Sequence, residues 1–424
     1  METINRLESE VRGYVRSFPV EFASASGSRI TAADGTVYLD FFGGAGALNY
    51  GHNEATMKAA LIDYLQADGI AHGLDLATTE KIRFLETFEE VIMQPRGLDY
   101  KIQFPGPTGT NAVEAALKLA RKVKERHSVL YFTNGYHGMT LGSLSVTGNA
   151  SKRAGAGVSL SDTMPLPYSD YYGDGRDTAA DFQALLENTS SGVEKPAAVI
   201  LETVQGEGGV NVADYAWLQR IEKLCREHDI LLIVDDIQAG VGRTGPFFSF
   251  EPAGIKPDIV TLSKSLSGMG LPFAVTLLRP DLDAWDPGEH NGTFRGNNHA
   301  FVTATVALER YWRDDKFEQE TLRKGEMMRQ RIEKIVADSG LKAEVRGRGM
   351  FLGIDCENPA LADKIAAACF ERKLLMETAG ANDNVVKFML PLTTTDAEIE
   401  EGLDIVAAAI QDVLRAEGLV RGVA

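Results

Sequence analysis

The chain has 424 residues, of which 44% are hydrophobic and 24% are charged. This length predicts more than one packed lobe, and the composition excludes a chain that is largely disordered. The 43 Lys and Arg residues against 60 Asp and Glu residues give a formal net charge of −17, which argues against a protein that binds nucleic-acid phosphates.

Two further absences narrow the class of protein. The N-terminal string METINRLESEVRGYV is not a signal peptide, and the apolar runs are far shorter than the roughly 20 residues that span a bilayer. The three cysteines are scattered and the seven histidines show no metal-ligand spacing. We therefore expect a cytoplasmic protein with no membrane contact, no disulfide framework and no metal site.

The first predicted elements are a helix over residues 2–15 and a hairpin over residues 29–40, with its turn at Ala33-Asp34-Gly35. From residue 111 onward, amphipathic helices follow apolar strands that do not alternate with polar residues. The predicted helices are 111–123 and 215–227, and the predicted strands are 129–132, 197–201, 230–234, 259–262 and 273–278. This order predicts an α/β fold with a mostly parallel central sheet covered on both faces.

The pattern changes after residue 300. Helical periodicity runs over 301–336, and two predicted strands, 344–356 and 385–390, flank a helix at 359–372. This α+β pattern indicates a second lobe. We predict an N-terminal segment, 1–50, that joins a C-terminal small domain, 306–424, and a large domain over 51–305.

One glycine-rich string matches a dinucleotide-binding pattern. Gly240-Val241-Gly242-Arg243-Thr244-Gly245 fits G-x-G-x-x-G and follows an apolar strand. In such a site the glycines open a helix, whereas here the string PFFSFEP follows. A nicotinamide-dependent oxidoreductase therefore stays a remote alternative. No G-x-x-x-x-G-K-[ST] string occurs, so the sequence gives no P-loop.

Lys264 directly follows the predicted strand 259–262. Parallel sheets place ligands at this end of a strand, and burial there lowers the pKa of an amine and makes it nucleophilic. Gly109 and Thr110 open the helix that continues over 111–123, so free backbone N–H groups offer an anion site.

Three more side chains complete the predicted pocket. Tyr136 offers an aromatic face to a flat ring, Asp235 offers a carboxylate to a protonated ring nitrogen, and Gln238 lies three residues further on. A phosphate site, a stacking ring, an acid and a strand-end lysine together predict a pocket for pyridoxal 5′-phosphate.

Six strings then carry a resemblance over nearly the full length. They are PTGTNAVEAALKLAR, GYHGMTLGSLSVTG, ILETVQGEGG, LLIVDDIQAGVGRTG, LSKSLSGMGLP and NGTFRGNN. The chain resembles the class III (ω-amino) aminotransferases, which are pyridoxal-phosphate enzymes of fold type I. FFGGAGALNYGHN and GTFRGNNHAFVTA are most similar to the members that serve ectoine biosynthesis.

That resemblance implies transfer of an amino group from L-glutamate to L-aspartate 4-semialdehyde, giving L-2,4-diaminobutyrate and 2-oxoglutarate. Other activities of the class stay open: ornithine, acetylornithine or 4-aminobutyrate aminotransferase, or an aminomutase.

The resemblance also implies a role for each matched residue. Lys264 and Asp235 would be catalytic, as the lysine that bonds to the cofactor and the partner of its ring nitrogen. The cofactor would be held by Gly109, Thr110, Tyr136, Asp235, Gln238 and Lys264. Thr293 would reach the phosphate of the neighbouring subunit, which implies a homodimer or a higher homo-oligomer.

Three positions depart from the family pattern, and two further residues bear on substrate binding. Asn111 stands where an acid is usual, and Glu202-Thr203 where Glu-Pro is usual. Lys387 stands where the family usually has an arginine that binds a substrate carboxylate. Lysine lacks the planar guanidinium with which arginine makes two hydrogen bonds to a carboxylate. Arg295 is a candidate to compensate, or it braces the dimer. Glu207 matches a gating glutamate, and we predict that it pairs with Lys387 as a switch between the two substrates.

Overall fold

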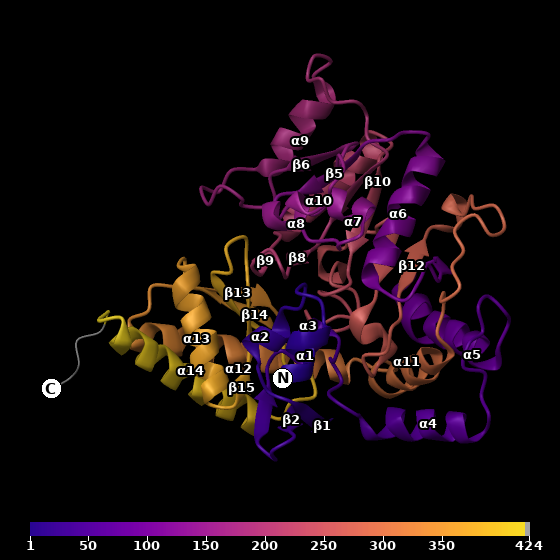
Figure 1. Ribbon diagram of the computed structural model, residues 1–424. Coiled ribbons are helices and arrows are strands. Elements are labelled where there is room, and N and C mark those ends of the chain that lie inside the picture. The colour runs from indigo at the N-terminus through magenta and orange to yellow at the C-terminus, as the bar shows by residue number, and fades with distance from the viewer. Residues whose placement is uncertain (420–424) are drawn as a thin grey trace.

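A seven-stranded sheet forms the centre of the larger lobe in the computed structural model, which describes residues 1–419 (Figure 1). Its strand order is β4-β12-β11-β10-β7-β5-β6. Strand β12 runs antiparallel to both of its neighbours, and the other pairs are parallel. The predicted α/β fold with a mostly parallel sheet is confirmed. The strands are β4 (Lys101–Gln103), β5 (Val129–Phe132), β6 (Thr163–Leu166), β7 (Ala198–Leu201), β10 (Leu231–Asp235), β11 (Ile259–Leu262) and β12 (Val275–Leu278).

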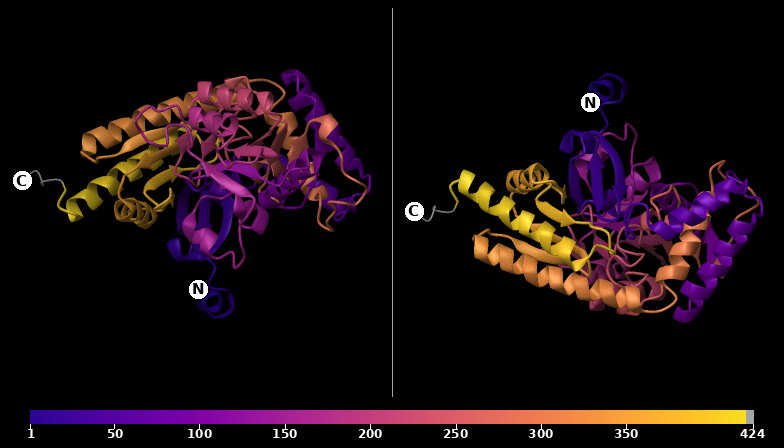
Figure 2. Two further views of the ribbon diagram at one scale, coloured as in Figure 1. Left: turned by 90° about the horizontal axis from the view of Figure 1, so that it is seen from above. Right: turned by 90° about the horizontal axis from the view of Figure 1, so that it is seen from below.

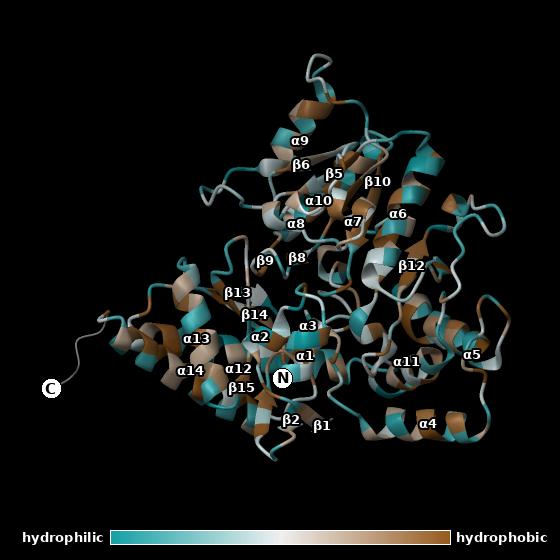
Figure 3. Cartoon of the chain, viewed as in Figure 1, coloured by the Kyte–Doolittle hydropathy of each residue, from teal (hydrophilic) through white to brown (hydrophobic). Residues whose placement is uncertain are grey.

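Both faces of this sheet are buried. Leu231 and Ile233 of β10 pack with helix α6 (Gly109–Lys124) on one face. Leu232 and Val234 pack with α10 (Tyr215–Glu227) on the other face. Because successive side chains of a strand point to opposite faces, the central strands β5, β7 and β10 are apolar throughout, apart from Asp235 at the end of β10. Figure 3 shows this as brown strands between helices whose surfaces are partly teal.

The remaining elements of the large lobe cover its edges and the carboxyl ends of its strands. The helices are α4 (Ala55–Gln66), α5 (Thr79–Phe88), α7 (Leu141–Ser145), α8 (Ala150–Ala154), α9 (Thr178–Glu187) and α11 (Asn298–Tyr311). A small ribbon pairs β8 (Val204–Gln205) with β9 (Asn211–Val212), and five short π or 3-10 helices lie at 89–93, 94–96, 251–253, 264–267 and 280–282. The predicted domain boundary at 305 falls inside α11.

The smaller lobe has a four-stranded antiparallel sheet in the order β13-β14-β17-β16, packed against helices that lie side by side in Figure 2. Its elements are α12 (Lys316–Ser339), β13 (Glu344–Arg348), β14 (Phe351–Asp355), α13 (Pro359–Glu371), β16 (Glu377–Ala379), β17 (Val385–Phe388) and α14 (Asp396–Ala416).

The N-terminal segment forms a separate sheet, β1 (Phe22–Ser26), β2 (Arg29–Ala32) and β3 (Val37–Asp40), which β15 (Leu374–Leu375) completes from the C-terminal part of the chain. The predicted hairpin is β2–β3. The predicted helix over 2–15 is wrong: the segment forms two short helices, α1 (Glu2–Leu7) and α2 (Tyr14–Ser17). Leu7 and Val11 are 69% and 91% exposed, so the apolar stripe has no surface to pack on.

Arg243 links the three parts of the chain. Its guanidinium is wholly buried and donates 2.7 Å to the carbonyl of Leu390 and 2.5 Å to Oδ1 of Asn49. It comes from the G-x-G-x-x-G string, and turns rather than a helix follow that string. The residue therefore joins the large lobe to the small lobe and to the N-terminal segment.

Among residues 1–419, no helix is long and apolar enough to cross a membrane. The same residues contain no group of three or more His, Cys, Asp or Glu side chains placed to hold a metal ion. The three cysteines are free and buried.

Candidate functional site

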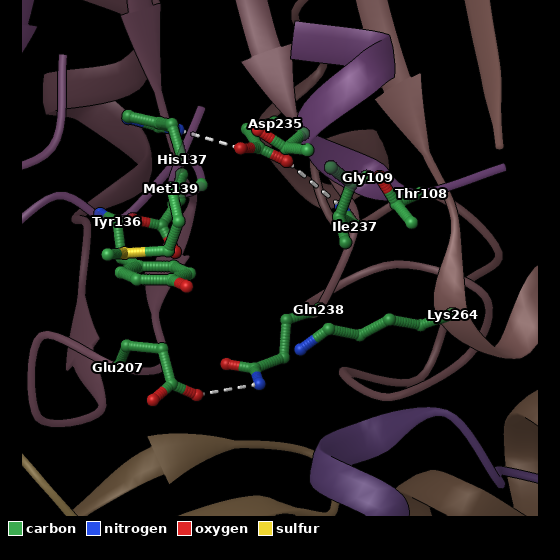
Figure 4. A pocket seen from close by; sticks show the side chains of 13 residues that line it. Thr108, Gly109, Tyr136, His137, Met139, Glu207, Asp235, Ile237, Gln238 and Lys264 are labelled. Carbon is green, nitrogen blue, oxygen red and sulfur yellow. Dashed lines mark hydrogen bonds and ion pairs between the residues drawn. The ribbon is translucent and has the colours of Figure 1, made fainter. Parts of the chain in front are cut away.

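The carboxyl ends of β5, β7, β10 and β11 open into one cavity of about 320 Å³ (Figure 4). The order of the strands explains this gathering, because the loops after parallel strands leave the sheet at the same edge. The cavity brings together most of the predicted site residues. It is lined by Thr108, Gly109, Thr110, Tyr136, His137, Gly138, Met139, Glu202, Glu207, Asp235, Ile237, Gln238 and Lys264.

Asp235 ends β10 and is held rigidly at the base of the cavity. Its Oδ2 lies 2.7 Å from Nδ1 of His137, and its Oδ1 accepts from Oγ1 of Thr261 at 3.0 Å. Burial opposes the charged imidazolium of His137, but the hydrogen bond and the charge of Asp235 leave its pKa above the ordinary value. The hydrogen bonds with His137 and Thr261 fix the carboxylate of Asp235 in orientation.

Lys264 opens the short helix after β11 with its backbone at φ +49°, in the left-handed region that side chains rarely adopt. Its Nζ donates to the carbonyl of Ala45 at 2.8 Å, so the glycine-rich segment 43–46 holds the amine. Burial lowers the pKa of Lys264, although the charge of Glu207 opposes this shift. The amine is thus placed in the cavity with an enlarged neutral fraction.

The first turn of α6 borders the same cavity. The N–H groups of a first helical turn have no partner within the helix, so those of Gly109 and Thr110 suit an anion. A Cβ at Gly109 would lie 2.8 Å from Cδ1 of Ile237, so any larger residue there would displace the side chain of Ile237, which also lines the cavity. Asn111 caps the helix: its Oδ1 accepts from the backbone N–H and the hydroxyl of Thr108, at 3.1 and 2.8 Å.

The Glu202-Thr203 departure also has a structural role. Glu202 accepts from the backbone N–H of Tyr136 at 2.9 Å, and burial raises the pKa of Glu202 to about 8. Thr203 donates to Oγ of Ser249 at 2.5 Å, and Ser249 in turn donates from both its hydroxyl and its backbone N–H to buried Asp236. The hydroxyl at 203 therefore belongs to the network that satisfies a second, buried aspartate.

Glu207, on the loop between β8 and β9, pairs with Lys387 of the small lobe. Its Oε1 lies 2.8 Å from Nζ of Lys387 and also accepts from Nε2 of Gln238 at 3.0 Å. Burial alone would raise the pKa of Glu207, but the charges of Lys387 and Lys264 lower it to about 2. The carboxylate pair of Glu207 and Glu377 holds the pKa of Lys387 above its ordinary value in spite of burial.

Three predicted residues lie outside the lining of this cavity: Lys387, which meets it through Glu207, and two residues that lie further away. Thr293 is exposed, and its carbonyl lies 2.8 Å from Nε2 of His72. Arg295 donates from Nε to the carbonyl of Phe104 at 3.1 Å and lines a different cavity. Within one chain, neither side chain reaches the group around Lys264.

The residues of the cavity fit pyridoxal phosphate. Gln238 is 9% exposed, and its Oε1 has no hydrogen-bond partner within residues 1–419. A buried orphan acceptor calls for a donor, which a ring hydroxyl supplies. Tyr136 offers an aromatic face, Asp235 a carboxylate, Lys264 an amine, and the first turn of α6 an anion site.

Three members of the site were not predicted as such: His137 as the partner of Asp235, and the two buried acids Glu202 and Glu377. His137 had a signal, because it adjoins Tyr136 in the quoted string GYHG. Glu377 had none, since only the pairing of β16 with β17 places it opposite Lys387.

Comparison with known proteins identifies the family. A family model described as aminotransferase class-III matches residues 12–410. The chain therefore belongs to the class III aminotransferases. This confirms the predicted reaction class, the pyridoxal-phosphate cofactor and the fold type I architecture. The alternative of a nicotinamide-dependent oxidoreductase is dropped.

Among its relatives are diaminobutyrate–2-oxoglutarate transaminases. The one from Halalkalibacterium halodurans is 55% identical over 99% of this chain and 98% of its own length. The one from Nocardia farcinica is 58% identical over 96% of this chain and 93% of its own length. A solved structure of ornithine aminotransferase from Toxoplasma gondii, with partial occupancy of PLP at its active site, has a TM-score of 0.85 at 27% identity and covers 98% of this chain and 95% of its own.

Proposed function

We propose that this protein catalyses the reaction named in its curated relatives. It transfers an amino group from L-glutamate to L-aspartate 4-semialdehyde, giving L-2,4-diaminobutyrate, a precursor for ectoine synthesis, and 2-oxoglutarate. Relatives of that name that are 54–58% identical over nearly the whole chain support the choice of substrates. The observation that carries the chemistry is the placement of Lys264 and Asp235 in one cavity with the first turn of α6.

Each residue of the cavity has a task in this proposal. When bound, the pyridoxal ring supplies an electron sink for the charge that develops on the substrate carbon. Asp235, held by His137, would keep the proton on the ring nitrogen. Tyr136 stacks on the ring, Gln238 contacts the ring oxygen, and the first turn of α6 binds the phosphate through Gly109 and Thr110.

Lys264 handles the protons of the reaction. Its neutral Nζ would remove the proton from the substrate carbon that carries the amine and deliver it to the cofactor carbon that takes over the amine. Burial supports this task because it lowers the pKa of Lys264 and so increases the neutral fraction near pH 7. The carbonyl of Ala45 orients the amine while it is free.

Glu207 and Lys387 form the switch between the two substrates. When the pair is closed, Glu207 neutralises the charge of Lys387, and a substrate that reacts through its ω-amino group meets no free cation there. With the pair open, Lys387 meets the α-carboxylate of glutamate. The variant Glu207→Gln should therefore alter the glutamate half-reaction relative to the diaminobutyrate half-reaction in stopped-flow absorbance measurements. Equal changes in both half-reactions would contradict the switch.

A homodimer completes the site in this proposal. Thr293, exposed in a single chain, contributes its hydroxyl to the phosphate site of the partner subunit, and exposed Phe294 beside it suits burial at an interface. Arg295, close to Thr293, approaches the same partner cavity as a second cation for a substrate carboxylate.

A product assay tests the whole proposal. Purified holoenzyme is incubated with L-glutamate and L-aspartate 4-semialdehyde, and mass spectrometry follows L-2,4-diaminobutyrate and 2-oxoglutarate. We expect both products in equal amounts, and neither from Lys264→Ala saturated with the cofactor. If glutamate is consumed by a single turnover but no diaminobutyrate forms, the acceptor is a different ω-aldehyde, such as that of the ornithine or 4-aminobutyrate enzymes.

A further inference from the structure

Lys387 faces two carboxylates rather than one. Glu377 of β16 stands directly opposite Lys387 of β17 in the antiparallel register, so both side chains point to the same face of the small sheet. Oε1 of Glu377 lies 3.0 Å from Nζ of Lys387, and Oε1 of Glu207 lies 2.8 Å from the same nitrogen. Glu377 and Lys387 are 7% and 0% exposed.

Two carboxylates share one ammonium in this group. Glu207 and Glu377 both contact Nζ of Lys387, and Lys264 lies close enough for its charge to act on both acids. Burial raises the pKa of Glu377 in spite of these two lysines. The contact of Oε1 of Glu377 with Lys387 lacks hydrogen-bond geometry, so this buried oxygen has no hydrogen-bond partner within residues 1–419. Its Oε2 accepts from the hydroxyl of Tyr14 at 3.1 Å. A buried carboxylate oxygen that has an ion pair but no hydrogen bond favours a further donor, and a cationic donor most strongly.

A second cavity leads to this carboxylate. It has about 560 Å³ and meets the cavity of Lys264 at Glu207, which lines both. Its charged lining is acidic, with one lysine against four carboxylates: Lys152, Glu207, Asp363, Glu377 and Asp383. Glu377 is also close enough to Lys264 for its charge to raise the pKa of that amine. The site therefore has an acidic side next to the reacting amine.

We propose that Glu377 binds the α-ammonium group of the ω-amino substrate and thereby selects L-2,4-diaminobutyrate, and L-aspartate 4-semialdehyde, over substrates that lack this group. This inference rests on the proposed function. In the ω half-reaction the closed Glu207–Lys387 pair neutralises the lysine, which leaves the charge of Glu377 for the substrate. The α-amino group is largely protonated near pH 7, so it supplies this cationic donor.

Two amines separate recognition of the ammonium from the chemistry. L-2,4-Diaminobutyrate and 4-aminobutyrate present the same ω-amine and differ at the α-carbon, where only the former has an ammonium. The half-reaction of the holoenzyme with each amine is followed by cofactor absorbance, and the ratio of the two second-order rate constants measures discrimination. Glu377→Gln should lower this ratio by roughly 10- to 100-fold, as expected for loss of one hydrogen bond between charged groups. General loss of activity cancels in the ratio.

Matched variants keep the test specific. Asp363→Asn and Asp383→Asn remove carboxylates that line the same cavity but do not contact Lys387. Each variant should leave the ratio within about threefold of the wild-type value. Glu377→Asp, which keeps the charge, should give an intermediate ratio and carries the test if Glu377→Gln does not fold. A wild-type ratio in both Glu377 variants, or an equal fall in the Asp363 variant, overturns the inference. Wild-type enzyme that takes no amino group from diaminobutyrate refutes the proposed function itself.

Discussion

At the scale of single residues, two neighbouring aspartates at the end of β10 have opposite fates. Asp235 faces the cavity and pairs with His137, whereas Asp236 points away from it and is wholly buried. Ser249 donates to Asp236 from its hydroxyl and from its backbone N–H, the latter at 3.0 Å. Burial nevertheless raises the pKa of Asp236 to about 7. The second aspartate is thus a structural acid that is mostly protonated below neutral pH.

This raised pKa predicts how stability depends on pH. Between its ordinary pKa of 3.8 and its folded pKa of about 7, Asp236 holds a proton in the folded chain and loses it on unfolding. Stability from this group is therefore fully present below pH 3.8 and is lost as the pH rises through 7, by roughly 4 kcal/mol in all. Asp236→Asn, which cannot ionise, should remove this loss in urea unfolding measured at a series of pH values. The exposed control Asp68→Asn should leave the pH profile unchanged, and a persistent loss in the Asp236 variant contradicts the assignment.

At the scale of elements, the start of α6 serves as the anion site of the cavity. Thr110 is the second residue of that helix, and its Oγ1 lies 2.7 Å from Oγ1 of Thr140, which donates to Glu114 at 2.5 Å. Because the hydroxyl proton of Thr140 goes to Glu114, the hydroxyl of Thr110 donates to Thr140 while no ligand is bound, and it turns its proton to a phosphate only when one binds. Helix α6 itself is anchored by its apolar face against the sheet, so the site does not depend on a mobile loop.

Removal of this hydroxyl should weaken cofactor binding. Thr110→Ala loses one hydrogen bond to a charged phosphate, which corresponds to roughly a tenfold rise in the Kd for pyridoxal phosphate. The Kd is measured by absorbance titration of the cofactor-free protein. Thr110→Ser, which keeps the hydroxyl, is the control and should bind nearly as wild type does. Equal affinities of the alanine and wild-type proteins would place the phosphate elsewhere.

The elements also show what sequence can and cannot predict. Helix 111–123 and strand 259–262 were predictable because their apolar patterns are long and regular, and Lys264 followed from its place after a strand. The split of the predicted helix 2–15 was not, because only the absence of a packing surface beneath Val11 reveals it. Glu377 was out of reach for a different reason: it is close to Lys387 only through the pairing of β16 with β17.

At the scale of the whole molecule, the proposed site needs two chains, and mixing inactive variants tests this. Lys264→Ala and Thr293→Glu inactivate opposite contributions, so a mixed dimer contains one intact site. Equal mixing after reversible dissociation should restore about a quarter of wild-type activity. A mixture of Lys264→Ala with Asp235→Asn is the matched control, because both residues belong to the same cavity and no intact site forms. Absence of recovery in the first mixture contradicts a shared site.

The buried guanidinium of Arg243 has a consequence for how such a chain can be engineered. Burial lowers its pKa to about 9, and its described hydrogen bonds go to neutral oxygens of Asn49, Met350, Met389 and Leu390. A small lobe transplanted from a relative must therefore place backbone carbonyls at the same positions. Otherwise the guanidinium of Arg243 is buried in the chimera without hydrogen-bond acceptors. The two lobes are consequently poor candidates for modular exchange, and a graft that leaves Arg243 without Asn49 should be recovered mainly as insoluble protein.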